Sequence, residues 1–197
     1  MGDSRRAKIS RKTKETDIVL EINLDGEGKS EIKSGIGFFD HMLTLFARHG
    51  FFDLSVHCDG DTDVDGHHSV EDIGIALGDA FCEALGDKGG IARYATFFVP
   101  MDEALAFVSV DVSGRPYLVY DAPEMAPMIG GYDTELTEEF LRAFSVHAGL
   151  TLHVRVIYGN NSHHMVEAIF KCLGHALHLA TRADKNVKGV LSTKGVL

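Results

Sequence analysis

Apolar and polar residues alternate along several short segments of the chain, and apolar residues recur with a helical period along four longer ones. The alternation of Ile18, Leu20 and Ile22 with polar neighbours predicts a half-buried strand over 16–23. The glycine-rich stretch after it predicts a turn, with a returning strand over 31–36 that completes a hairpin. Further strands are expected at 54–58, 97–99 (ended by Pro100), 103–112, 117–120 and 151–158, and helices at 38–48, 67–85, 134–147 and 162–181.

Both ends of the chain are polar. Six of the ten residues at 5–14 are Lys or Arg, which is typical of a solvated N-terminal segment, with a mobile arm as the alternative. The last segment, 184–197, contains three lysines and two glycines and is too polar to be core.

Composition narrows the class of protein. The 197 residues are 45% hydrophobic and 24% charged, which is ordinary for a globular chain and allows one domain over 1–197. A net charge of −10 argues against a nucleic-acid partner. Apolar runs fall short of the roughly 18 residues of a membrane span, and 1–16 has no signal-peptide core. Three cysteines without a CxxC pair fit free thiols, so we expect a cytoplasmic protein.

An internal repeat changes the interpretation of the fold. The segment 67–80, HHSVEDIGIALGDA, matches 163–176, HHMVEAIFKCLGHA, at eight of fourteen positions with an offset of 96. His57 and His153 each lie ten residues before their His-His pair. We infer a tandem duplication, with repeats over about 1–95 and 96–197, that forms two pseudo-symmetric α/β halves.

The repeated motif carries the chemistry of a metal site. In both copies the first His and the Glu four residues later lie on one helical face and can chelate one ion. The second His points about 100° away and can serve a second ion. A helix start also favours neutral imidazoles that are able to ligate. Nitrogen and carboxylate ligands without thiolates suit Mn²⁺, Fe²⁺ or Zn²⁺. The candidate ligands are His67, His68, Glu71, His163, His164 and Glu167.

Two further positions are candidates to complete the metal coordination. His41, in FFDHM, is the best upstream ligand, with a structural histidine as the equal alternative. The corresponding region of the second repeat reads TEEF, so Glu139 would take the same part there.

Other polar positions are given structural interpretations. Ser162 is expected to cap the helix that begins there. His49 and His147 lie near helix C-termini, where an imidazolium is favoured. The loop 61–66 resembles a calcium-binding loop but lacks its terminal Glu, so we expect it to turn the chain from strand to helix and to deliver His67.

Together these motifs resemble the imidazoleglycerol-phosphate dehydratase family. The matching stretches are RKTKET at 11–16, GFFDHML at 37–43, DGHHSVED at 65–72, PMDEAL at 100–105, SGRP at 113–116, NSHHMVEAIFK at 161–171 and STKGVL at 192–197. The resemblance runs from about residue 5 to the end of the chain. It leaves no room for the phosphatase domain fused to some members, so the monofunctional form is expected.

The resemblance implies an α/β fold of the two-layer α+β type, with helices packed between two sheets. It also implies a homo-oligomer of 24 subunits with active sites between subunits, and two Mn²⁺ ions per site. Carried over by motif, one ion would be held by His41, His68, His163 and Glu167, and the other by His67, Glu71, His164 and Glu139.

The implied reaction is the dehydration of D-erythro-imidazole-glycerol phosphate to imidazole acetol phosphate in histidine biosynthesis. Glu15 matches the family's acid/base glutamate and would also contact substrate, and His41, Glu71 and Glu167 would take part in catalysis as ligands. Asp102 is a further acidic candidate. The phosphate would be bound by Arg93, Arg115, Lys171, Ser192 and Lys194, whose charges suit its oxygens.

A metal on the ring nitrogen addresses the main barrier of this reaction, because it acidifies the imidazole toward an imidazolate that can expel the neighbouring hydroxyl. The residue pattern by itself leaves two alternatives. A dinuclear phosphoester hydrolase would use the same ligands and cations, and a non-catalytic metal-binding shell would use the ligands alone.

Overall fold

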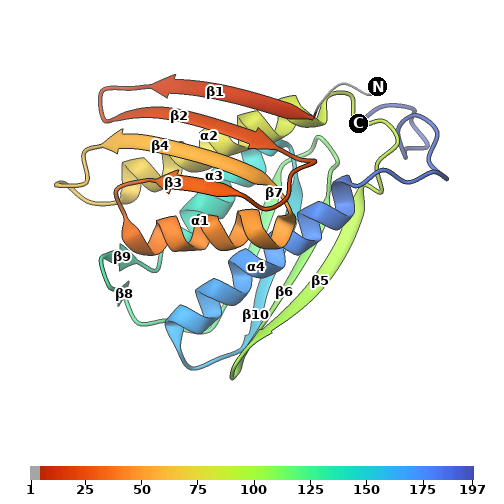
Figure 1. Ribbon diagram of the computed structural model, residues 1–197. Coiled ribbons are helices and arrows are strands. Elements are labelled where there is room, and N and C mark those ends of the chain that lie inside the picture. Colours follow the sequence, from red (N-terminus) through yellow and green to blue (C-terminus); the bar gives the residue numbers. More distant parts are fainter. Residues whose placement is uncertain (1–4) are drawn as a thin grey trace.

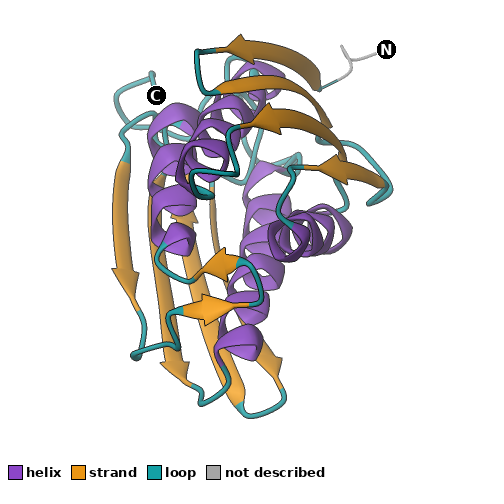
Figure 2. Cartoon of the chain, turned by 90° about the vertical axis from the view of Figure 1, so that its left-hand side faces the viewer, coloured by secondary structure: helices purple, strands orange, loops and turns teal. Residues whose placement is uncertain are grey.

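Four helices lie between two four-stranded sheets in the computed structural model, which describes residues 5–197 (Figures 1 and 2). The first sheet has the order β1 (Arg6–Lys12), β2 (Thr16–Asn23), β4 (Asp53–Gly60), β3 (Ser30–Lys33). The second has the order β5 (Tyr94–Met101), β6 (Ala104–Asp111), β10 (Thr151–Tyr158), β7 (Tyr117–Asp121). The helices are α1 (Gly37–Gly50), α2 (His67–Leu85), α3 (Leu136–Ala148) and α4 (Ser162–Thr181), and β8 (Met128–Ile129) and β9 (Tyr132–Asp133) form a small hairpin.

The two sheets have the same topology, as the repeat predicts. In each, two strands form an antiparallel hairpin, the third strand pairs antiparallel with the second, and the outermost strand is parallel to its neighbour. The expected helices at 67–85 and 162–181 and strands at 16–23 and 151–158 are confirmed to the residue. Within residues 5–197, no helix combines the length and apolar composition needed to cross a membrane.

Two expectations for the first half are wrong. The strand after the glycine-rich turn does not return along β2, because β1 and β4 occupy both edges of β2; β3 pairs in parallel with β4 instead. The alternative of a mobile arm is wrong, since most of the basic segment forms β1, whose side chains are mostly exposed or half-buried as a solvated segment predicts. This strand is held to α2 by Arg11, whose guanidinium donates to the buried carboxylate of Asp72 at 2.9–3.0 Å.

Two smaller expectations are also corrected. Pro100 does not end its strand: β5 continues through it to Met101, and an edge strand tolerates a proline because one side of its backbone needs no hydrogen-bond partner. The cap of α4 is Asn161 rather than Ser162. Its side chain accepts from the backbone N–H groups of His163 and His164, whereas the Ser162 hydroxyl accepts from the Ala126 N–H.

The helices pack in two parallel pairs, α1 with α4 and α2 with α3, and a glycine lies at each crossing. A Cβ on Gly174 of α4 would lie 2.6 Å from the Phe46 carbonyl oxygen of α1. A Cβ on Gly78, its repeat counterpart in α2, would lie 3.0 Å from the Phe144 carbonyl oxygen of α3. Stacked and edge-on phenylalanines fill the space between the pairs, including Phe140 against Phe170 at 5.3 Å. Close backbone approach therefore aligns the N-terminal ends of each pair.

In the C-terminal half of each helix pair, a histidine contacts a residue of the neighbouring helix. The positions correspond in the two repeats, but the partner residue differs. His147 Nδ1 lies 2.8 Å from an Asp79 carboxylate oxygen. His49 Nδ1 instead lies 3.2 Å from His175 Nε2. Burial and the neighbouring His175 lower the pKa of His49, and burial lowers that of His175, so the expectation of an imidazolium at His49 is wrong.

Replacing Gly174 with alanine is expected to lower the free energy of unfolding by about 2 kcal/mol or more, because the new methyl group overlaps backbone that cannot move independently. The gain in helix propensity, about 1 kcal/mol, offsets only part of this cost. Chemical denaturation of the metal-free protein measures the change. Gly37→Ala is the matched control, since within residues 5–197 its Cβ would have no neighbour within 4 Å beyond the adjacent residues and the backbone of its own helix. Equal effects of both variants would contradict the packing argument.

Acidification is expected to destabilise the protein through the His49–His175 pair. The folded-state pKa of both histidines lies below the unfolded value of about 6.5, so their contribution is complete above that pH and is lost as the pH falls through the lowered values. His175→Gln should therefore flatten the dependence of unfolding free energy on pH between about 7.5 and 5.5. His57→Gln, on the exposed face of β4, should keep the original dependence. A His175→Gln profile parallel to that of the unsubstituted protein would refute this assignment.

Candidate metal centre

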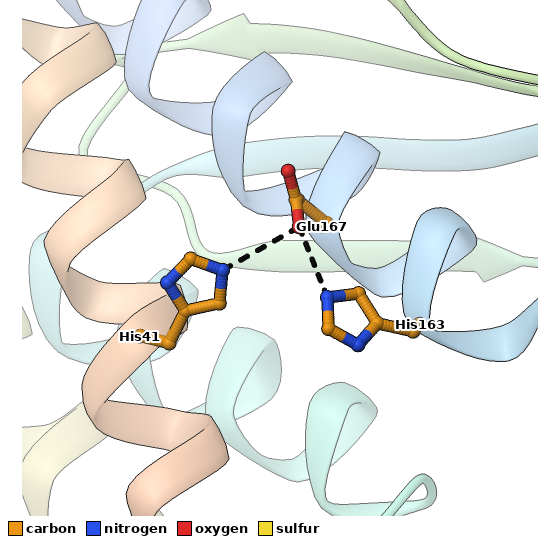
Figure 3. A group of neighbouring side chains, drawn as sticks. All are labelled: His41, His163 and Glu167. Atoms are coloured by element: carbon orange, nitrogen blue, oxygen red, sulfur yellow. Dashed lines mark hydrogen bonds and ion pairs between the residues drawn. The ribbon is translucent and has the colours of Figure 1, made fainter.

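Three predicted ligands from two helices converge at the N-terminal end of the α1–α4 pair (Figure 3). His41 is the fifth residue of α1, and His163 and Glu167 lie one turn apart on α4. Glu167 Oε2 is 3.1 Å from His163 Nε2 and 3.5 Å from His41 Nε2. One ligand atom of each residue lies within 4.8 Å of the others. The Phe38 ring contacts His163 edge-on at 5.1 Å and limits how that imidazole can turn.

The carboxylate of this cluster is buried and held in its charged form. Burial alone would raise the pKa of Glu167, but the Lys171 ammonium, with Nζ 2.6 Å from Oε1, and the imidazoles of His163 and His41 together lower it. Lys171 uses one carboxylate oxygen and the two histidines face the other. The second oxygen is thus directed at the space between the imidazoles.

The donor set fits a divalent transition metal. Two imidazole nitrogens and a carboxylate oxygen already face one another, and they are separated by distances that a single ion of this class can bridge. The two imidazoles are about half exposed while the carboxylate is buried, so the cluster is open on one side. A three-donor cluster open on one side leaves positions for further ligands.

The repeat-related residues on α2 and α3 do not form an equivalent cluster within the described chain. His67 Nε2 and Glu71 Oε2 are 4.0 Å apart, one turn from each other as the spacing predicts. Glu139 faces Arg142 instead, with its Oε2 3.9 Å from Nε. The three residues are the repeat counterparts of His163, Glu167 and His41, in that order. The α2–α3 pair therefore offers a ligand pair rather than a triad.

The remaining predicted ligands, His68 and His164, each bind a carboxylate through Nδ1. His68 Nδ1 is 3.0 Å from Asp61 Oδ2, and His164 Nδ1 is 2.7 Å from Glu103 Oε2. These hydrogen bonds raise the pKa of both imidazoles, which opposes the effect expected of the helix start. The loop 61–66 does deliver the histidines as predicted, since Asp65 Oδ1 also accepts from the His67 N–H at 2.7 Å.

Glu103 is a site residue that the sequence motifs do not single out. Its pKa is lowered to about 2, chiefly by the hydrogen bond with His164 and then by the backbone N–H groups of Asn161 and Asn160. Asp102, beside it, lies on the other side of the same ring, with Oδ2 3.7 Å from His164 Nε2. A signal was present in PMDEAL, because Glu103 directly precedes β6 as Glu15 directly precedes β2.

Glu15 lies on an exposed turn that is fastened to the start of α2. The Thr16 hydroxyl donates to Asp72 on α2 at 2.6 Å, and the Glu15 carbonyl oxygen accepts from the Asp61 N–H at 3.1 Å. Because Asp61 also binds His68, one residue connects the Glu15 backbone to a predicted ligand. Within residues 5–197, the Glu15 carboxylate has neither a hydrogen-bond partner nor an ion pair.

Most of the predicted phosphate-binding residues share one cavity of about 980 Å³, beneath the C-terminal segment. Arg93, Arg115, Ser192 and Lys194 line it, and so does Lys188, which the sequence did not indicate. The buried Arg93 guanidinium already makes hydrogen bonds within the protein. It donates to both carboxylate oxygens of Asp111 at 2.7 and 3.1 Å and to the Leu191 carbonyl oxygen. The side chains of Arg115, Lys188 and Lys194 are exposed, so they are the cations open to an anion.

Lys171 does not line this cavity. Its ammonium pairs with Glu167 and lies 3.4 Å from the Met101 sulfur, so within one chain it belongs to the histidine cluster rather than to the cationic cavity.

Comparison with known proteins identifies relatives of this chain. A family model described as Imidazoleglycerol-phosphate dehydratase matches residues 34–177. An imidazoleglycerol-phosphate dehydratase of Clostridium botulinum is 61% identical over 191 residues, covering 97% of both chains. One of Thermoanaerobacter pseudethanolicus is 58% identical over 193 residues, covering 98% of this chain and all of that one.

Solved structures agree as well. The dehydratase of Staphylococcus aureus superposes with a TM-score of 0.83 at 42% identity, covering 91% of this chain and 99% of that one. The Pyrococcus furiosus enzyme, in complex with (S)-C348, gives 0.82 at 40% identity, covering 96% and 100%.

The duplicated α+β fold with its helix-borne histidine–carboxylate cluster therefore defines a class of carbon–oxygen lyases. The chain belongs to the imidazoleglycerol-phosphate dehydratase family and is a hydro-lyase of histidine biosynthesis.

Proposed function

We propose that this chain removes water from imidazoleglycerol phosphate to give imidazole acetol phosphate, using two Mn²⁺ ions held by the repeated histidine motifs. The convergence of His41, His163 and Glu167 is the observation that carries the proposal, because it assembles a nitrogen–carboxylate donor set from segments more than 120 residues apart. Membership of the family supplies the reaction. As an enzyme of amino-acid biosynthesis, the protein is expected to work in the cytoplasm.

The proposed ligands are divided between copies of the chain. His41, His163 and Glu167 would hold one ion, with His68 as the fourth ligand; the other ion would be held by His67, Glu71, His164 and Glu139. Within one chain, His68 is outside the triad and its Nδ1 faces Asp61. A second copy that supplies His68 completes the set, which supports active sites between subunits in a homo-oligomer of 24 chains.

Other side chains of the protein bind the phosphate or hold parts of the site in position. Lys194 and Arg115 bind the phosphate, with Ser192 as a hydroxyl donor, and this fixes the glycerol chain relative to the histidines. Lys171 holds the ligand Glu167 in place through an ion pair. Arg93 holds the C-terminal segment in place through a hydrogen bond to the Leu191 carbonyl oxygen.

The bound ions would act as Lewis acids that make the substrate ring easier to deprotonate. Glu15, exposed and unpaired within residues 5–197, takes the proton from the carbon adjacent to the one that loses the hydroxyl. It then returns a proton to the carbon that lost the hydroxyl, when the enol becomes the ketone.

The first test is metal-dependent turnover of imidazoleglycerol phosphate, followed as both ketone and inorganic phosphate. Protein stripped with a chelator is expected to be inactive, and Mn²⁺ should restore ketone formation without phosphate release. His68→Ala and His164→Ala should each lower kcat/KM at least about 100-fold, because each removes a ligand.

Thr44→Ala, on the exposed side of α1, is the control and should retain activity. Phosphate release would favour the hydrolase alternative, and Mn²⁺ binding without turnover would favour the non-catalytic shell; either result would refute the dehydratase proposal.

Lys194→Ala and Arg115→Ala are expected to raise KM for the substrate about 10- to 100-fold, since each removes a charge-assisted hydrogen bond worth about 1.5–3 kcal/mol. Lys185→Ala removes a lysine from the same C-terminal segment but outside the cavity, and should leave KM unchanged. Steady-state kinetics on the Mn²⁺-loaded enzyme distinguish these outcomes. An equal change in all three variants would indicate general electrostatic attraction rather than a phosphate site.

A further inference from the structure

The hydrogen bonds of His68 and His164 are alike although their carboxylate partners are unrelated by the repeat. Each imidazole occupies the second position of its His-His pair, and each gives Nδ1 to a carboxylate. Asp61 comes from the loop before α2, whereas Glu103 comes from the β5–β6 turn. The same contact has thus been built twice from different parts of the chain.

Glu103 divides its two oxygens between the backbone and the ring. Oε1 accepts from the Asn160 and Asn161 N–H groups at 3.1 and 2.7 Å, and Oε2 faces His164 Nδ1 at 2.7 Å. Asn161 in turn caps α4, the helix that carries His164. Two backbone donors therefore fix the orientation of the carboxylate before the ring binds it.

Glu103 is also the positional counterpart of Glu15. Each directly precedes the second strand of its hairpin, and the pairs Arg11–Ile18 and Val99–Ala106 occupy equivalent positions in the two ladders. The Glu15 carboxylate is unpaired within residues 5–197, whereas both Glu103 oxygens are used. The same hairpin position therefore carries a free acid in one half and a fixed acceptor in the other.

We propose that Glu103, and Asp61 in the other half, are positioning residues that hold the Nδ1–H of His164 and His68 so that Nε2 is presented to a metal ion. This inference rests on the proposed Mn²⁺ function. A neutral imidazole carries one N–H, so a carboxylate that accepts from Nδ1 leaves the lone pair on Nε2. The same hydrogen bond fixes the plane of the ring and increases its basicity as a ligand.

Glu103→Gln tests the proposal sharply. The two backbone N–H groups should keep the amide oxygen of glutamine, so its NH₂ group replaces Oε2 and donates to Nδ1. The lone pair of His164 is then taken up and Nε2 carries the proton. We expect the affinity for Mn²⁺, measured by calorimetric titration of the metal-free oligomer, to fall about 10- to 100-fold.

Asp61→Asn provides an internal comparison. Within residues 5–197, both Asp61 carboxylate oxygens contact only His68, so an asparagine is free to turn its oxygen toward Nδ1. The Mn²⁺ affinity of this variant should change less than about threefold. Glu31→Gln, on exposed β3, is the matched control and should bind Mn²⁺ like the unsubstituted protein.

A double-mutant cycle separates positioning from damage to the loop. If Glu103 acts through His164, Glu103→Gln should add no further loss of Mn²⁺ affinity in a His164→Ala background. Size-exclusion chromatography should show the same oligomer for all variants.

An unchanged affinity in Glu103→Gln, or a loss that persists without His164, would overturn the proposal while Mn²⁺-dependent ketone formation by the unsubstituted enzyme still stood. Absence of Mn²⁺ binding by the unsubstituted protein would overturn the proposed function and this inference together.

Discussion

The close crossing of parallel helices at Gly174 and Gly78 is the constraint on which the rest of the structure depends. Only a residue without a side chain lets α4 approach the α1 backbone so closely, and the same holds for α2 and α3. Because the paired helices run in parallel, their N-terminal ends meet, and His41 reaches His163 and Glu167 there. Two positive helix ends at one place also favour the buried carboxylate. Packing in the middle of the helices thus determines the chemistry at their ends.

Duplication accounts for the backbone arrangement that the two halves share, and sequence differences between the halves account for their different side-chain contacts. The sheets share one topology and the helix pairs one crossing, yet the His147–Asp79 ion pair corresponds to a contact between two histidines. The buried Asp72 that fastens β1 to α2 has an alanine as its counterpart in the second repeat.

The sequence predicts what depends on local pattern and misses what depends on distant partners. Helices α2 and α4 and the repeat follow from apolar period and identity, and His163 and Glu167 meet because they are one turn apart. The pairing of β3 does not follow, since it depends on which edges of neighbouring strands are free. The role of Glu103 does not follow either, because it reaches His164 through the fold and no spacing rule connects residues 103 and 164.

The incompleteness of the histidine cluster in one chain is itself informative. Glu167 is buried and neutralised by Lys171, so the folded monomer already stabilises its charged form. The imidazoles of His41 and His163 remain about half exposed, and His67 on the other helix pair is equally open. Under the proposed function, the exposed imidazoles and the buried carboxylate would form half of a coordination sphere, and a second copy of the chain would supply the other half.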